Sequence, residues 1–302
     1  MSKLLFSISV LSGLVSFSAY NLGFALEKKA IQRLPEKVKN KTSSFLKAIL
    51  TNPLWLFGLF LTIISVGFYF VALMWAPLSA IAPLSGFGLI IVVIFAHLDL
   101  KESLRKIEIF SFVLIIIGSC TSSYLTSKAI ISYSWNQWTD LAHSTGGIVF
   151  LCLSACLGIS FLFFKFSKFN MITTYMIAFF SGTLAGIQAI VIKGTTVGIS
   201  NKAFNSNLLV FLSYIFTILM AALFSSGALQ FAFKKGNVSI IMAIYNGIMT
   251  LFPILFGGII LIEWENLLII SKIFLGIAVI MTLIGVIILS IKHSQNSQDN
   301  NL

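Results

Sequence analysis

Pro77-Leu78-Ser79-Ala80-Ile81-Ala82-Pro83-Leu84-Ser85 opens one long apolar segment, and Asn237-Val238-Ser239-Ile240-Ile241-Met242-Ala243-Ile244-Tyr245 opens another. Each segment ends at an acidic turn, Asp99-Leu100-Lys101-Glu102 in the first and Glu263-Trp264-Glu265 in the second. A pattern that occurs twice in an apolar chain is typical of a membrane carrier built from two related halves. We therefore expect the fold to consist of two similar halves.

The composition indicates an integral membrane protein of the all-α class, a polytopic helical bundle. Hydrophobic residues make up 58% of the 302 positions and charged residues 10%, whereas soluble domains carry roughly 25% charged residues. A membrane-spanning helix needs about 20 mostly apolar residues. This rule predicts nine spans, at residues 4–26, 54–76, 78–98, 107–126, 145–164, 171–193, 207–231, 238–261 and 268–291.

The repeat extends beyond the two quoted segments. Ser16 and Lys28 in the first span correspond to Ser181 and Lys193 in the sixth, at the same spacing. Spans two to four then match spans seven to nine, and span five has no counterpart. We expect a single transmembrane domain over 1–291, with repeat one at 1–126, a linking helix at 145–164, repeat two at 171–291 and a polar tail at 292–302. Because a single span joins two repeats of four spans each, the two repeats enter the membrane from opposite faces. The arrangement is a 4+1+4 inverted repeat.

The distribution of charge favours a membrane over a nucleic acid as the partner of this chain. The net charge is +11, and a large share of the basic residues lies in the first loop, at 27–52. Alternate loops and the tail carry most of the Lys and Arg, so the positive-inside rule places the N-terminus outside and the C-terminus in the cytoplasm of a plasma-membrane protein. The first loop is a candidate interfacial helix, broken near Pro35, that favours anionic lipids. The alternative is that its basic residues serve only as an orientation signal.

No catalytic arrangement is visible in the sequence. The three histidines have no neighbouring nucleophile, and no glycine-rich phosphate loop is present. Cys120, Cys152 and Cys156 lie in apolar spans, where cysteine behaves as a small hydrophobic residue. We expect neither an enzyme nor a bound cofactor, and the metal ligands, if there are any, stay unknown.

Polar residues within the spans are the candidate substrate pathway, because burying them in lipid is unfavourable without partners. The repeat matches Ser85 with Tyr245, so the third and eighth spans are expected to line a central cavity. Pro83 removes a backbone hydrogen bond and is the candidate bend or gate; the second copy has Ala243 there. The alternative is that these residues form ordinary interhelical hydrogen bonds. The pathway candidates are Asn21, Ser85, Gln188, Gln230, Tyr245 and Asn246.

The acidic residues all lie near the ends of the predicted spans, so no carboxylate is expected deep within a span. Glu102 and Glu263 end the third and eighth spans, and each is expected to cap the start of the next helix, where a carboxylate meets the positive end of the dipole. The alternative role, shared with Glu27, is to attract a cation to the mouth of the pathway.

Several stretches resemble the NIPA-like magnesium transporters of the drug/metabolite transporter (EamA-like) superfamily. Residues 21–30, Asn21-Leu22-Gly23-Phe24-Ala25-Leu26-Glu27-Lys28-Lys29-Ala30, resemble the end of that family's first span. The Ser79-x-x-x-Pro83 element with Glu102 resembles its first-half signature. Glu263-Trp264, followed by Gly276-x8-Gly285, resembles its second-half ending. The resemblance implies a secondary carrier or channel-like transporter, with Mg²⁺ as its associated substrate.

Three functions remain open from the sequence. The first is a multi-pass secondary transporter of Mg²⁺ or another divalent cation. The second is export or uptake of a small organic metabolite or drug by alternating access, which suits a pathway without deep carboxylates. The third is a non-transporting membrane scaffold. A homo-oligomer is compatible with each of them.

Overall fold

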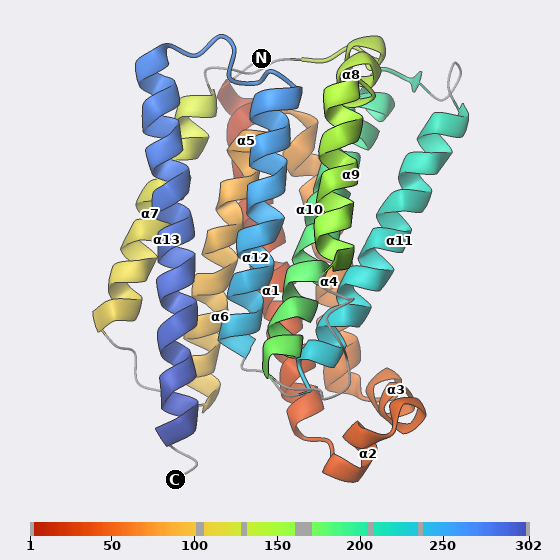
Figure 1. The fold of residues 1–302 in the computed structure, drawn as a ribbon, viewed down its shortest axis with the longest axis vertical. Coiled ribbons are helices and arrows are strands. Elements are labelled where there is room, and N and C mark those ends of the chain that lie inside the picture. Colours follow the sequence, from red (N-terminus) through yellow and green to blue (C-terminus); the bar gives the residue numbers. More distant parts are fainter. Residues whose placement is uncertain are drawn as a thin grey trace.

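The computed structural model describes residues 3–100, 106–127, 132–160, 171–203, 208–234 and 238–299, and each element within these ranges is helical (Figure 1). In chain order the elements are α1 (Lys3–Gln32), α2 (Glu36–Asn40), α3 (Thr42–Leu50), α4 (Pro53–Met74), α5 (Leu78–Ile81), η1 (Ala82–Leu84), α6 (Ser85–Leu100), α7 (Lys106–Ser127), α8 (Trp135–Ala142), α9 (Thr145–Ser160), α10 (Met171–Ser200), α11 (Leu208–Ala232), α12 (Val238–Leu255), η3 (Phe256–Ile260) and α13 (Ile269–Asp299).

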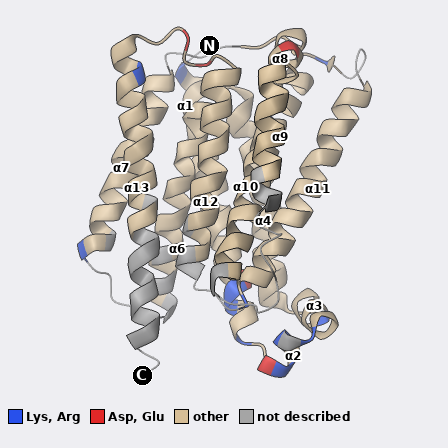
Figure 2. Cartoon of the chain, viewed as in Figure 1, with Lys and Arg blue, Asp and Glu red and all other residues tan. Residues whose placement is uncertain are grey.

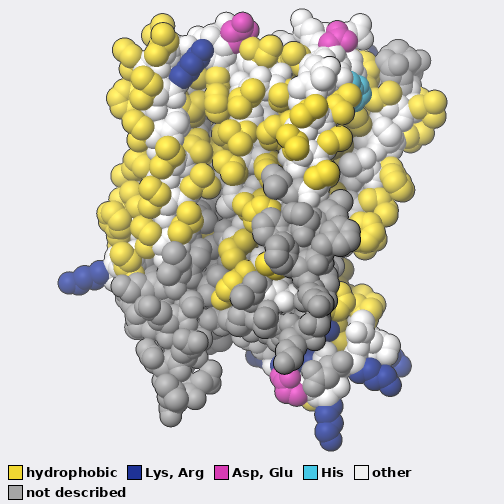
Figure 3. Space-filling model, viewed as in Figure 1, with side chains coloured by type: hydrophobic (Ala, Val, Ile, Leu, Met, Phe, Trp, Pro, Cys, Tyr) yellow, Lys and Arg dark blue, Asp and Glu magenta, His cyan; other side chains and the backbone are white. Residues whose placement is uncertain are grey.

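The helices form a membrane bundle, which confirms the all-α prediction. Five helices of the described ranges are long and apolar enough to cross a membrane, and they lie in α1, α4, α7, α10 and α11. Shorter apolar helices occupy Leu78–Val92, Thr145–Cys156, Ile244–Ile260 and Ile269–Gly285. Hydrophobic side chains cover the outer face of the upright helices, and Lys and Arg gather at its two ends (Figure 3). Because so much apolar surface points outward, the surroundings of these helices are hydrocarbon.

The bundle contains two groups of three helices, and in each group one long helix packs against two others. In the first group α1 packs against α4 and α6, and in the second α10 packs against α11 and α12. Contacts of α6 with α12 join the groups, and α7 pairs with α13 along one edge. The α1–α4 contact is close because Gly23 and Gly58 face each other, and a Cβ on either glycine would lie 2.6 Å from the other's carbonyl oxygen.

The third and eighth predicted spans break differently. The first-half segment changes from α5 to the 3₁₀ turn η1 at Pro83, and then continues as α6. Ser119 of α7 donates a hydrogen bond to the Pro83 carbonyl (2.7 Å), and Ser123 donates to the Ala80 carbonyl (2.6 Å). These carbonyls are therefore satisfied by protein rather than offered to a solute. In the second half, α12 is unbroken past Ala243 and changes into the π-helical turn η3 only after Pro253.

Short helices cover the two ends of the bundle. After α1 ends, α2 and α3 follow Pro35 at the end of the bundle where α13 ends, which agrees with the predicted break (Figure 1). Phe45 and Ile49 of α3 are buried, while Leu46, Lys47 and Leu50 are exposed, as in an interfacial helix. The opposite end is covered by α8, which the sequence analysis did not anticipate; its start is fixed by a capping box between Ser134 and Gln137.

Candidate functional site

A cavity of about 490 Å³ lies between α1, α4 and α11, with α3 at one end. Most of its walls are aliphatic, and its polar side chains come from α1, α4, α10 and α11. The polar and aromatic side chains that line it are Tyr20, Glu27, Trp55, Thr62, Gln188, Ser226, Gln230 and Phe231. The volume lies within the range of about 300–1,000 Å³ that is usual for ligand sites.

Glu27 is a buried carboxylate in the wall of this cavity. Its side chain is 1% exposed, and Gln230 Nε2 donates a hydrogen bond to Glu27 Oε2. Trp55 Nε1 in turn donates to Gln230 Oε1 at 3.1 Å. Glu27 lies near the end of α1, as expected from the sequence, but because α1 continues to Gln32 its side chain is enclosed by the bundle. A buried carboxylate with neutral hydrogen-bond partners is the group to which a cation is attracted.

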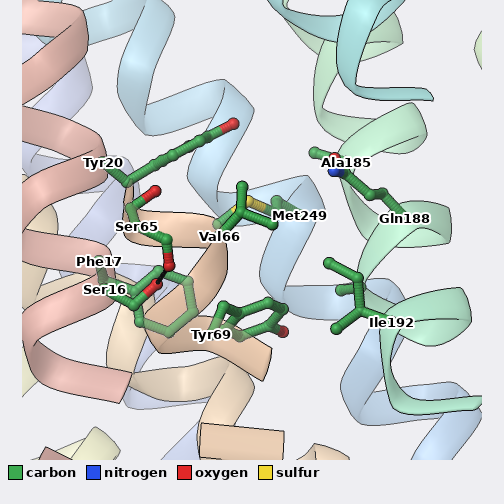
Figure 4. A pocket seen from close by; sticks show the side chains of 11 residues that line it. Ser16, Phe17, Tyr20, Ser65, Val66, Tyr69, Ala185, Gln188, Ile192 and Met249 are labelled. Carbon is green, nitrogen blue, oxygen red and sulfur yellow. Dashed lines mark hydrogen bonds between the residues drawn. The ribbon is translucent and has the colours of Figure 1, made fainter. Parts of the chain in front are cut away.

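A second, smaller cavity of about 50 Å³ lies on the other side of Tyr20. Ser16, Ser65 and Tyr69 line it from α1 and α4, and Tyr20 and Gln188 lie on opposite sides of it (Figure 4). Tyr20, Val66 and Gln188 line both cavities. The Tyr20 hydroxyl is hydrogen-bonded to the hydroxyl of Tyr245 on α12, so the ring between the two cavities is held in place.

The predicted pathway residues divide into two sets. Gln188 and Gln230 line the large cavity, as described above. The other four are buried in direct contacts: Asn246 Nδ2 donates to Asn21 Oδ1 (3.0 Å), Ser85 is hydrogen-bonded to Thr250, and Tyr245 to Tyr20. Asn246 Oδ1 is buried and has no hydrogen-bond partner among the described residues. These four residues link α1 and α6 to α12 and do not line either cavity.

Sequence reasoning missed Tyr20 and Trp55. Tyr20 lies one turn after Ser16 and next to Asn21, and this proximity to two polar residues was a usable signal. An aromatic residue in an apolar span, however, is most often ordinary packing. Trp55 stands at the start of its span, where tryptophan is common at membrane interfaces. Its pairing with Gln230 joins residues 175 positions apart and has no local signature.

Glu263 lies at the opposite end of the bundle from α2 and α3, and its side chain is 1% exposed. Its carboxylate accepts hydrogen bonds from the backbone N–H of Leu78 (2.8 Å) and of Ser79 (2.9 Å), and from the Ser79 hydroxyl (2.5 Å). A capping role was predicted for Glu263, but for the wrong helix. It caps α5 of the first half rather than the next helix, α13, because the turn after η3 directs it back into the bundle. Glu102 lies outside the described residues.

Lys193 completes a clamp on the connection between α4 and α5. Its Nζ donates hydrogen bonds to the carbonyls of Leu73 (2.7 Å) and Ala76 (2.8 Å). The cation thus meets the negative end of α4, while the carboxylate of Glu263 meets the positive end of α5. Nearby, Tyr133 donates a hydrogen bond to the Leu261 carbonyl (2.8 Å). Burial, and secondly the charge of Glu263, raise the pKa of Tyr133, so its hydroxyl stays protonated as a donor.

A matching contact occurs at the other end of the bundle. Lys28 of α1 donates a hydrogen bond to the Phe233 carbonyl, just after α11. The offset that relates Ser85 to Tyr245 in the sequence also relates Leu73 to Phe233. A second pair of contacts follows the same rule: Ser16 donates to the Ser65 carbonyl and Ser181 to the Ser225 carbonyl, each at 2.7 Å.

The described ranges contain no group of three or more His, Cys, Asp or Glu side chains arranged to hold a metal ion. Within these ranges, a cation in the large cavity would therefore meet a single carboxylate, Glu27, together with neutral oxygen atoms.

Comparisons with known proteins agree on one family. A family model described as "Magnesium transporter NIPA" matches residues 6–295. Among curated proteins, the chain is 24% identical over 251 residues to "Probable magnesium transporter NIPA6" of Arabidopsis thaliana, covering 80% of this chain and 75% of the relative. It is 27% identical over 196 residues to "Probable magnesium transporter NIPA9" of the same plant, covering 61% of this chain and 54% of that relative. No solved structure matches the chain.

Proposed function

Because the chain belongs to the magnesium transporter NIPA family, we propose that it carries Mg²⁺ across a membrane and that the ion meets Glu27 in the large cavity. It is a multi-pass membrane transporter and not an enzyme. The single observation that carries the assignment of the site is the buried carboxylate of Glu27, held by the neutral partner Gln230 in the wall of a cavity of about 490 Å³.

The dimensions of the cavities favour a hydrated ion. Mg²⁺ gives up its water reluctantly and is usually bound through one or two carboxylates plus water. The large cavity, of about 490 Å³, offers more room for such a hydrated ion than the cavity of about 50 Å³. In this proposal Glu27 binds the ion or its waters, and the amide oxygens of Gln188 and Gln230 accept hydrogen bonds from those waters. Passage beyond Tyr20 then requires a change of conformation.

We propose nine membrane spans in a 4+1+4 arrangement, with repeats at 1–126 and 171–291 joined by the helix at 145–164. Related halves are supported because the hydrogen bond of Lys28 to Phe233 matches that of Lys193 to Leu73. The hydrogen bond of Ser16 to Ser65 likewise matches that of Ser181 to Ser225. In a plasma membrane the N-terminus would be outside and the C-terminus cytoplasmic. This orientation agrees with the positive-inside rule, because many Lys and Arg residues lie at the α2–α3 end in Figure 2. The large cavity then belongs to the cytoplasmic half and the small cavity to the outer half.

Alternating access follows from this arrangement. The outer end is closed by Lys193 and Glu263, which hold the connection between α4 and α5. We propose that release of this clamp opens the small cavity to the outside. Meanwhile the hydrogen bond of Lys28 to the Phe233 carbonyl, just after α11, keeps the cytoplasmic end closed. Pro83, at the 3₁₀ turn between α5 and α6, is the proposed bend for this motion.

The experiment is Mg²⁺ uptake by the purified full chain in liposomes, followed with an enclosed Mg²⁺-sensitive dye. We expect saturable uptake by the wild type and loss of uptake in Glu27→Gln, which retains the shape of the side chain but not its charge. The matched control is Glu265→Gln, at an exposed position, which should transport normally. Uptake that persists in Glu27→Gln would contradict the role of Glu27. Absence of Mg²⁺ flux together with counterflow of an organic solute would contradict the assignment of the substrate.

A further inference from the structure

The large cavity opens sideways toward the bilayer. Its mouth is formed by Ile63 of α4 and by Leu219 and Leu223 of α11, which are 62%, 63% and 66% exposed. This opening exists because α4 packs mainly on α1, and α11 mainly on α10. In Figure 1, α11 leans away from the bundle at the end opposite to α3. The side walls of the cavity are therefore continuous with the hydrocarbon of the membrane.

The cavity is elongated along the helix axes. The residues that line it extend from Trp55 to Val66 on α4 and from Leu219 to Phe231 on α11. At a rise of about 1.5 Å per residue, each wall is about 17 Å long. A narrow apolar slot that runs parallel to the bilayer normal and opens to the hydrocarbon matches the shape of an acyl chain.

Basic side chains surround the end of the slot at the membrane surface. Leu46 and Leu50 of α3 line the cavity at this end, and Lys47 lies between them in sequence and is exposed. Lys234 lies over the rings of Phe45 and Phe231, at 4.0 and 4.5 Å from the ring centroids, where the slot ends. Two further lysines, Lys37 and Lys39, lie on α2, which is labelled in Figure 2. The charge at this end is complementary to a phosphate group.

We propose that the cavity is an anionic phospholipid site. One acyl chain lies between α4 and α11 along Ile63, Leu219 and Leu223, and the phosphate lies beside Lys47 at the end of α3. The acyl chain lies against the apolar side of the cavity and covers its sideways opening, so that the space for a solute beside Glu27 and Gln230 is closed off from the hydrocarbon of the membrane. The inference stands on the shape and charge of the site and holds for any transported solute.

Gly227 offers a direct test, because it lines the cavity and a Cβ added there would meet no atom within 4 Å. Gly227→Leu therefore adds an apolar side chain to the slot at a position where a Cβ has room, and it raises the helix propensity of α11. The matched control is Gly276→Leu on α13. A Cβ at Gly276 also meets no atom within 4 Å, and this position lies on the α7–α13 edge, away from the cavity.

The experiment measures lipid retained by the full chain after detergent washing, using native mass spectrometry and vesicles of phosphatidylglycerol mixed with phosphatidylcholine. We expect the wild type and Gly276→Leu to retain one phosphatidylglycerol. Gly227→Leu should lower the occupancy about tenfold, which corresponds to about two excluded methylene groups. Lys47→Gln should reduce the preference for phosphatidylglycerol over phosphatidylcholine.

Two results would overturn the proposal. One is a wild type that retains no phospholipid, or retains phosphatidylcholine equally well. The other is equal retention by Gly227→Leu and the wild type when both elute as intact protein in gel filtration. A Gly227→Leu variant that did not elute as intact protein would be replaced by Ser226→Leu, judged by the same criterion. Since lipid retention is measured without Mg²⁺ flux, failure of this site and failure of the proposed transport function are separable.

Discussion

Lys28 and Phe233 lie 205 residues apart, and the Lys28 ammonium donates a hydrogen bond to the Phe233 carbonyl at the end of α11. The equivalent lysine of the second half, Lys193, bonds the equivalent carbonyl of the first half, Leu73, at the end of α4. Each half thus places a cation at the negative end of a helix that belongs to the other half. These two contacts lie at opposite ends of the bundle, where an alternating-access carrier has its gates.

Lys193→Met should loosen the outer end selectively. A hydrogen bond from a charged donor contributes about 1.5–3 kcal/mol, so its loss should raise the population open to the outside about tenfold or more. The readout is labelling of Ala189→Cys, in the wall of the small cavity, by an impermeant thiol reagent added outside. Cys120, Cys152 and Cys156 are replaced by Ala in all variants. Lys28→Met is the control, and an equal increase in outside labelling for both lysine variants would contradict separate gates.

Glu263→Ala should destabilise the fold, because it leaves the backbone N–H groups of Leu78 and Ser79 buried without an acceptor. Hydrogen bonds to a carboxylate are strong, and the expected loss is about 3 kcal/mol or more. The measurement is the melting temperature of the purified protein in detergent. Glu265→Ala, at an exposed neighbouring position, should change stability by less than about 0.5 kcal/mol. Similar melting temperatures for the two variants would argue against the cap on α5.

Gly23→Ala should separate α1 from α4. The new Cβ would lie 2.6 Å from the Gly58 carbonyl oxygen, and the helices must move apart at a cost of about 1–3 kcal/mol. Thermal unfolding in detergent measures this loss. The control is Gly67→Ala on α4, where a Cβ meets no atom within 4 Å. That substitution should be neutral or stabilising by up to about 1 kcal/mol. A Gly23→Ala variant as stable as the wild type would mean that the two backbones are not in contact.

The proposed orientation makes a prediction about two exposed lysines at opposite ends of the bundle. Lys202→Cys, at the end of α10, should react with an impermeant reagent in intact cells, and Lys37→Cys, in α2, should react only after permeabilisation. Both variants carry Ala at the three native cysteines. The reverse pattern of labelling would show that the N-terminus is cytoplasmic.

The apolar segments could be predicted from the sequence because each is dictated locally, by about 20 residues that cannot remain in water. The helix α8 was missed because its amphipathic residues, Trp135–Ala142, do not form an apolar run. Likewise, the burial of Glu27 was missed because α1 extends past the apolar stretch that defined its span.

The contacts of the site were less accessible to sequence reasoning. Matching positions of the repeat related Ser85 to Tyr245, and so the third span to the eighth, whereas the structure pairs Asn21 of α1 with Asn246 of α12. The partner of Glu263 depends on how a turn after η3 directs one side chain toward α5, 184 residues earlier in the chain. No local pattern encodes such a distance. The sideways opening of the large cavity likewise depends on which helices pack together.

The clamp on α4 and α5 has a consequence for biogenesis. Both of its charged groups, Lys193 and Glu263, follow the segment that they hold by more than 100 residues. During synthesis the first half therefore enters the membrane with the facing ends of α4 and α5 uncapped, and with Lys28 lacking the carbonyl that it later binds. A charged residue within a membrane helix is costly until it finds its partner. The facing ends of α4 and α5, and Lys28, therefore reach their hydrogen-bond partners only after the second half has been synthesised.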